Sequence, residues 1–270
     1  MMNFRNFKTL PAQVNSQIDR AAEIWKKYLG NCLSGIYIHG SIALGFFQED
    51  SSDIDILIIS ERRIPHNERL LIANEIIKID RSPCPLEMSA ILYTDLKSWK
   101  HPCRCQFHYS GSWTITYRQL LAGTITGSSI VEEDFPDPDI ACHVRLTDQC
   151  GICIYGRPIK EVFPVIPEND FWSSLTYDLD DNLLKISSEK DPVKLADNII
   201  VCGRVLSYRH EKKILSKYES AFWTLNHVPD RFKFIIKNVI RSRFYNEPVY
   251  KFSQNDLDDL QQYFADEIKG

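Results

Sequence analysis

The sequence predicts an α/β domain with a mixed sheet, followed by an all-α helical bundle. In the N-terminal part, short apolar runs typical of buried strands alternate with segments of helical periodicity. In the C-terminal part, strand signals fade and helical spacing dominates. Pro158, Pro164 and Pro167 separate the two parts. We therefore expect a first domain over residues 1–163 and a second over residues 164–270.

The first domain is predicted element by element from the spacing of its apolar residues. A helix over residues 11–29 has a proline in its first turn, carries one apolar stripe and ends at Gly30. The acidic segment 132–139 is expected to be a turn-rich loop that leads into a helix. The other expected elements are strands at 35–39 and 54–59, a helix at 62–78, strands at 85–92 and 106–110, helices at 113–121 and 141–149, and a strand at 151–155.

The second domain is predicted from helical spacing and from residues typical of helix N-termini. Apolar residues between positions 175 and 186 recur at helical spacing. Asp191 followed by Pro192 begins a helix that continues to Tyr208, and Ser216 with Glu219 forms a capping box. Further helices are expected from position 229 to about 245 and from 256 to 268.

Composition excludes several classes of protein. Hydrophobic residues make up 44% and charged residues 25% of the 270 residues, as in ordinary globular domains. A net charge of −4 argues against a nucleic-acid-binding surface. No run is apolar enough for a membrane span, and residues 1–8 lack the apolar core of a signal peptide. We therefore expect a cytoplasmic protein without nucleic-acid or membrane partners.

The eight cysteines are expected to be reduced thiols, because no export signal is visible. One residue separates Cys103 from Cys105, and two separate Cys150 from Cys153. These pairs do not repeat a known zinc-ligand spacing, so we expect no structural zinc.

The segment from Gly40 to Asp55 carries the chemistry. Gly40 and Ser41 follow the first predicted strand, where a turn offers backbone N–H groups and a hydroxyl to a phosphate. Asp53 and Asp55 flank one apolar residue, so on a strand both side chains project to the same side. Two adjacent carboxylates repel each other unless a cation lies between them, and Mg²⁺ is the cation usually found beside nucleotide phosphates. The segment therefore predicts a site for a metal-bound triphosphate.

Glu87 is the only acid in the strand expected at 85–92. A lone glutamate among apolar residues needs an explanation, because burial of an unpaired charge is unfavourable. Glu87 either joins the two aspartates or lies on the exposed face of an edge strand.

This arrangement resembles the nucleotidyltransferase superfamily, in which a Gly-Ser turn, a spacer and Asp-x-Asp are joined by a carboxylate from a later strand. Further segments, in their order along the chain, resemble the aminoglycoside adenylyltransferases that act on streptomycin and spectinomycin. The similarity extends over about residues 30–250. The segments that carry it lie at 107–113, 137–141 and 151–163 in the first domain and at 203–206, 215–217, 221–223 and 228–229 in the second.

The resemblance implies a nucleotidyltransferase domain and a role for each matching residue. Asp53 and Asp55 would bind magnesium, and Glu87 would be the catalytic base. The implied nucleotide-binding residues are Gly40, Ser41, Ser52, Arg204, Lys217 and Tyr245, although Tyr245 is off the family's register by about two residues. Trp113 falls where the family has a drug-contacting tryptophan, but it could also be an ordinary core aromatic residue.

The acidic residues that hold the drug in the family do not match directly. An ungapped match places Lys190 and Lys194 at two of these positions. Asp191 and Asp197 lie close by, and Asp178 lies one helix earlier. These three aspartates are the candidate substrate-binding acids, and the identity of the drug stays open.

The expected function is magnesium-dependent transfer of AMP from ATP to a hydroxyl of spectinomycin, streptomycin or both, which would give resistance. We expect a monomer that binds ATP and a small cationic antibiotic. One alternative is a nucleotidyltransferase that modifies a protein or another small molecule, as in toxin–antitoxin pairs. Another is a non-catalytic nucleotide-binding regulator, which would be expected to lack one of the carboxylates, whereas Asp53, Asp55 and Glu87 are all present.

Overall fold

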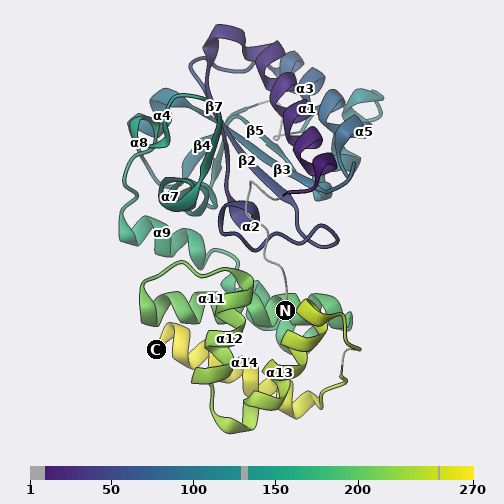
Figure 1. The fold of residues 1–270 in the computed structure, drawn as a ribbon, viewed down its shortest axis with the longest axis vertical. Coiled ribbons are helices and arrows are strands. Elements are labelled where there is room, and N and C mark those ends of the chain that lie inside the picture. The colour runs from purple at the N-terminus through teal and green to yellow at the C-terminus, as the bar shows by residue number, and fades with distance from the viewer. Residues whose placement is uncertain (1–9, 129–132, 249) are drawn as a thin grey trace. The chain divides into compact units, whose positions relative to one another are not determined.

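The computed structural model describes residues 10–128, 133–248 and 250–270 (Figure 1). The chain divides into two compact units, residues 1–174 and 175–270. The division falls at the end of helix α9 (Glu168–Leu175), C-terminal to the proline-rich segment.

The first unit is built on a mixed five-stranded sheet with strand order β5-β3-β2-β1-β7. β2 and β3 are parallel, and the other neighbouring strands are antiparallel. This confirms the predicted mixed sheet. The strands are β1 (Leu33–Ile38), β2 (Ile54–Ser60), β3 (Leu86–Leu92), β5 (Phe107–Tyr109) and β7 (Ile152–Gly156).

Helices surround this sheet and bury its central strands. In Figure 1, α1, α3 and α5 lie together on one side of the sheet, and α3 contacts both of the others. Every residue of β1 is buried, as its short apolar run predicts. The helices of this unit are α1 (Ala12–Leu29), α2 (Gly40–Ala43), α3 (His66–Ile79), α4 (Tyr93–Lys97), α5 (Thr114–Leu121), α7 (Ile140–Cys150), α8 (Ile159–Val162) and α9.

A second, two-stranded sheet corrects the loop expected at 132–139. Residue 132 lies outside the described residues, but β6 (Phe135–Asp137) pairs antiparallel with β4 (Cys103–Cys105). The carboxylate of Asp134 is buried and forms ion pairs with Arg63 and Arg69. Since these arginines compensate its charge, the acidic segment packs against the unit instead of remaining solvated.

The second unit consists of helices among the residues described. The predicted N-terminal signals are present: Asp191 accepts hydrogen bonds from the N–H groups of Val193 and Lys194, and Ser216 and Glu219 form a reciprocal capping box. The longest helix, α11, contacts each of the other four. These helices are α10 (Leu179–Ser188), α11 (Pro192–Glu211), α12 (Lys217–His227), α13 (Asp230–Tyr245) and α14 (Gln254–Lys269).

None of the helices in the described ranges is both long enough and apolar enough to cross a membrane.

The pairing of β1 with β7 depends on a glycine. Gly156 has φ +93°, and an alanine Cβ there would lie 2.2 Å from the carbonyl oxygen of Ser34. We expect Gly156→Ala to lower the free energy of unfolding by about 3 kcal/mol, combining backbone strain of ~1–2 kcal/mol with a steric clash of ~1–3 kcal/mol. Urea unfolding of the purified protein measures this change.

Gly123 provides the matched control. Its φ is +68°, but its Cβ would meet no described atom within 4 Å. Gly123→Ala should therefore show only the strain of about 1–2 kcal/mol. Equal destabilisation by both substitutions would contradict the predicted steric clash at Gly156.

Candidate active site

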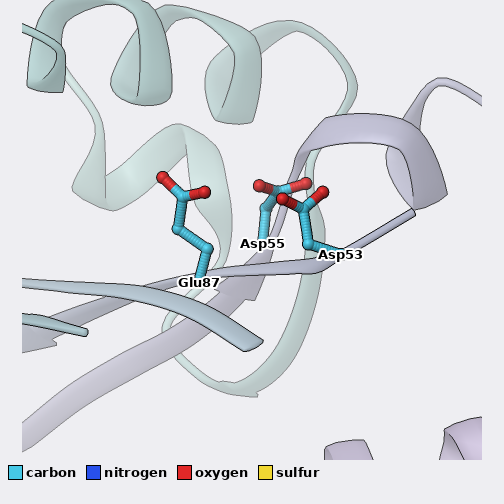
Figure 2. A group of neighbouring side chains, drawn as sticks. All are labelled: Asp53, Asp55 and Glu87. Carbon is cyan, nitrogen blue, oxygen red and sulfur yellow. The ribbon is translucent and has the colours of Figure 1, made fainter. Parts of the chain in front are cut away.

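Three carboxylates converge at one end of the parallel strand pair. Asp53 directly precedes β2, Asp55 is the second residue of β2, and Glu87 is the second residue of β3. Asp55 and Glu87 are direct partners in the parallel register. One carboxylate oxygen from each of the three residues lies within 4.8 Å of those of the other two. Figure 2 shows the three side chains extending from the same side of the strands toward a common space.

The prediction that Glu87 joins the two aspartates is confirmed geometrically. Glu87 is half-buried, and burial is the largest cause that raises the pKa of its carboxyl group. His143 opposes this rise, whereas the negative charge of Asp53 adds to it. A cation between Asp53 and Asp55 would relieve the repulsion among the three acids, and oxygen ligands of this kind suit Mg²⁺.

The turn after β1 is shaped by Gly40, which has φ +62°. A Cβ at this position would lie 1.7 Å from Oδ2 of Asp55, so only glycine allows the turn to approach this carboxylate. The next residue, Ser41, has a buried hydroxyl with no hydrogen-bond partner within the described residues. A buried hydroxyl of this kind suits a phosphate oxygen, which would accept its hydrogen bond.

Ser52 has a local structural role. Its hydroxyl accepts a hydrogen bond from the backbone N–H of Gln48 at 3.0 Å, and its own N–H donates to the carbonyl of Gln48 at 2.8 Å. These bonds close the loop that leads into Asp53. Ser52 therefore shapes the approach to β2, and its contact with nucleotide or metal stays a prediction.

Sequence reasoning missed two histidines and the role of two aspartates around Glu87. His39 and His143 are hydrogen-bonded to each other, and His143 acts electrostatically on Glu87. Asp137 and Asp139, just before α7, also raise the pKa of Glu87. The position of His39 directly before Gly40 could have drawn attention to it, but nothing in the spacing of His143 points to the site.

Trp113 is the predicted substrate contact in the first unit. It ends the short 3₁₀ helix Gly111–Trp113 that leads into α5, and 38% of its surface is exposed. It is therefore not an ordinary core residue, and its ring is accessible on the surface of this unit.

The predicted nucleotide-binding residues of the second unit lie on three helices. Arg204 lies on α11, and Lys217 is the exposed first residue of α12. A helix N-terminus and an ammonium group both favour an anion. Tyr245 ends α13, and its hydroxyl lies 3.2 Å from the hydroxyl of Tyr218.

Two of the three candidate substrate-binding acids have partners within the second unit. Asp191 caps α11, and Asp197 forms an ion pair with Nε of Arg243 at 3.0 Å. Asp178 precedes α10 and is exposed. Of the three, Asp178 has the carboxylate most readily presented to a cation from solution.

The model of the nucleotidyltransferase domain matches residues 18–108, which contain all three carboxylates. Fold and site together thus define a nucleotidyltransferase. The model of the aminoglycoside adenylyltransferase C-terminal domain matches residues 161–267. The chain belongs to the aminoglycoside adenylyltransferase family.

Individual relatives extend over most of the chain. A spectinomycin 9-adenylyltransferase of Campylobacter jejuni is 27% identical over 232 residues, covering 84% of this chain and 83% of the relative. An aminoglycoside (3'') (9) adenylyltransferase of Shigella flexneri is 21% identical and covers 95% of both chains. The crystal structure of a spectinomycin adenyltransferase from Enterococcus faecialis with ATP and spectinomycin has a similar fold, with a TM-score of 0.79 at 19% identity, covering 95% of this chain and 99% of that one.

Gly40→Ala is expected to weaken binding of magnesium-ATP. The added Cβ would displace the carboxylate of Asp55, and the positive φ would strain the turn. Changes that displace a metal-binding carboxylate typically reduce affinity by about 10–100-fold. Titration calorimetry with magnesium-ATP measures the dissociation constant.

Gly45→Ala is the control within the same segment. Gly45 has φ +78°, but its Cβ would meet no described atom within 4 Å. It should bind magnesium-ATP within about threefold of the wild type, a change of less than ~1 kcal/mol. Similar losses of affinity in both variants would show that strain alone, and not contact with Asp55, explains the effect.

Proposed function

We propose that this protein transfers AMP from ATP to a hydroxyl of spectinomycin. The observation that carries the proposal is the convergence of Asp53, Asp55 and Glu87 beside the turn at Gly40 and Ser41. Membership of the aminoglycoside adenylyltransferase family supplies the class of acceptor.

Asp53 and Asp55 would hold Mg²⁺, and Glu87 completes the acidic group. When bound, the metal supplies positive charge that neutralises the triphosphate. Ser41 would donate its buried hydroxyl to a phosphate oxygen. In the second unit, Lys217 and Arg204 are the cationic residues that the family resemblance assigns to nucleotide binding.

Glu87 acts as the general base in this proposal. The burial that raises its pKa also makes its carboxylate a better proton acceptor than an exposed glutamate. Glu87 takes the proton of the acceptor hydroxyl as the oxygen forms a bond to the α-phosphorus. The bond from that phosphorus to the bridging oxygen breaks, pyrophosphate leaves, and the acceptor carries AMP.

Spectinomycin is favoured over streptomycin by charge. Lys190 and Lys194 are both exposed and lie where the family resemblance expects acids. Their charge would oppose the dicationic guanidinium groups of streptomycin more than the compact spectinomycin. The exposed Asp178 would attract an ammonium group, and Trp113 would offer an aromatic surface to the drug.

Asp53→Asn and Glu87→Gln are expected to separate binding from chemistry. Asp53→Asn should raise the dissociation constant of magnesium-ATP, because it removes a ligand charge. Glu87→Gln should still bind magnesium-ATP, but its turnover should fall by about 10²–10⁴-fold, the contribution typical of a general base. Calorimetry and a pyrophosphate-release assay measure the two effects.

Asp50→Asn is the matched control, since it neutralises an exposed aspartate in the same loop. It should leave both binding and turnover close to the wild type. Near wild-type turnover of Glu87→Gln would remove Glu87 from the role of base.

Wild-type protein incubated with magnesium-ATP and a panel of aminoglycosides should add AMP to spectinomycin, as detected by mass spectrometry. Expression in a susceptible bacterium should raise the inhibitory concentration of spectinomycin more than that of streptomycin. Protection against neither drug, with ATP binding intact, would contradict the assignment of spectinomycin and indicate that the acceptor is a different small molecule or a protein. The reverse order of protection would show that Lys190 and Lys194 do not decide the preference.

A further inference from the structure

His39 and His143 form a hydrogen-bonded pair beside the acidic site. Nδ1 of His143 lies 3.2 Å from Nε2 of His39, and the two rings meet edge to face with centroids 4.7 Å apart. His39 directly follows β1 and His143 lies in α7, so the two residues are far apart in the sequence. Their hydrogen bond is a tertiary contact that local sequence patterns do not specify.

His39 is tied directly to the turn that approaches the carboxylates. It is the residue before Gly40, and only 3% of its surface is exposed. Its backbone N–H donates to the carbonyl oxygen of Asp55 at 3.1 Å. The backbone of His39 therefore links the turn at Gly40 to the start of β2.

His143 is fixed on the first turns of α7. Its N–H donates to the carbonyl of Asp139 at 3.1 Å, and its carbonyl accepts from the hydroxyl of Thr147 at 2.7 Å. Among the side chains that act electrostatically on Glu87, His143 has the largest effect and lowers its pKa, whereas Asp137 and Asp139 raise it. The placement of α7 thus sets the field around Glu87 as well as the position of His39.

In the contact between the two imidazoles, one ring must donate the hydrogen bond and the other must accept it. Burial lowers the pKa of His39 well below its usual value, so its ring is neutral at pH 7. A neutral imidazole has one donor and one acceptor, and the hydrogen bond therefore needs one ring to donate and the other to accept. A phenylalanine would fill a similar volume at either position but could not make this bond.

We propose that His39 and His143 are positioning residues that fix α7 against the turn at Gly40 and Ser41 and thereby prepare this turn for magnesium-ATP. The proposal rests on the nucleotide-binding part of the proposed function and does not depend on the acceptor. The pair acts through the turn and does not contact the reacting atoms. Its loss should weaken ATP binding even when the packing volume is kept.

A double-mutant cycle tests the pair. His39→Phe and His143→Phe should each raise the dissociation constant of magnesium-ATP by about fivefold, the ratio that corresponds to one hydrogen bond of ~1 kcal/mol. The double variant should be no weaker than either single variant, because the same bond is lost in all three. Calorimetry measures the affinity, and thermal unfolding shows whether each variant is folded.

His143→Gln separates the loss of the hydrogen bond from a change in packing. A glutamine amide can donate or accept one hydrogen bond to His39, so its affinity should recover to within about twofold of the wild type. It also keeps the test decisive if the buried His39→Phe variant fails to fold. His66→Phe, at an exposed histidine that begins α3, controls for a general effect of replacing histidine by phenylalanine.

Unchanged affinity in His143→Phe, multiplying effects in the double variant, or no recovery in His143→Gln would each overturn the proposal. These titrations contain no acceptor, so failure of this proposal can be distinguished from failure of the proposed transfer to spectinomycin. A wild-type protein that binds magnesium-ATP but adenylylates no drug would remove the spectinomycin assignment while the cycle still decides the role of the pair. A wild-type protein without affinity for magnesium-ATP would overturn both.

Discussion

The mutual repulsion of three carboxylates is the constraint on which the site depends. Asp53, Asp55 and Glu87 come within 4.8 Å of one another only because β2 and β3 are parallel and place Asp55 beside Glu87. Each of these acids raises the energy of its neighbours' charges. The buried strands hold the acids together against this repulsion. A divalent cation among them would neutralise the repulsion, which is why such a group of acids favours metal binding.

The surrounding backbone is adapted to the same constraint. Gly40 allows the turn to touch the carboxylate of Asp55, where any side chain would collide with it. The N–H of His39 donates a hydrogen bond to the carbonyl of Asp55 and thereby joins the turn to the strand. Contacts that fix a turn and a strand before binding limit the reorganisation that binding requires.

The sequence predicted those features that depend on local patterns. Apolar runs predicted β1, β2 and β3, the period of two placed Asp53 and Asp55 together, and a lone acid among apolar residues identified Glu87. It could not predict the register that pairs Asp55 with Glu87, or the hydrogen bond from His39 to His143, because both join distant segments. The strand β6 was missed because its acidic surroundings suggested solvent, and only the fold shows that Arg63 and Arg69 compensate Asp134.

Aspartates of this chain show why residue type alone does not define a site. Asp134 faces arginines and stabilises the fold, and Asp191 accepts N–H groups and starts a helix. Asp53 faces other carboxylates, an arrangement that favours a metal. Asp191 and Asp197 matched the expected drug-binding acids by position, yet a capping bond and an ion pair already use their charge. Either residue would have to lose this contact in order to hold a cationic drug. Within the described residues, the exposed Asp178 neither caps a helix with its side chain nor forms an ion pair with an arginine. The partner of each carboxylate therefore decides its function.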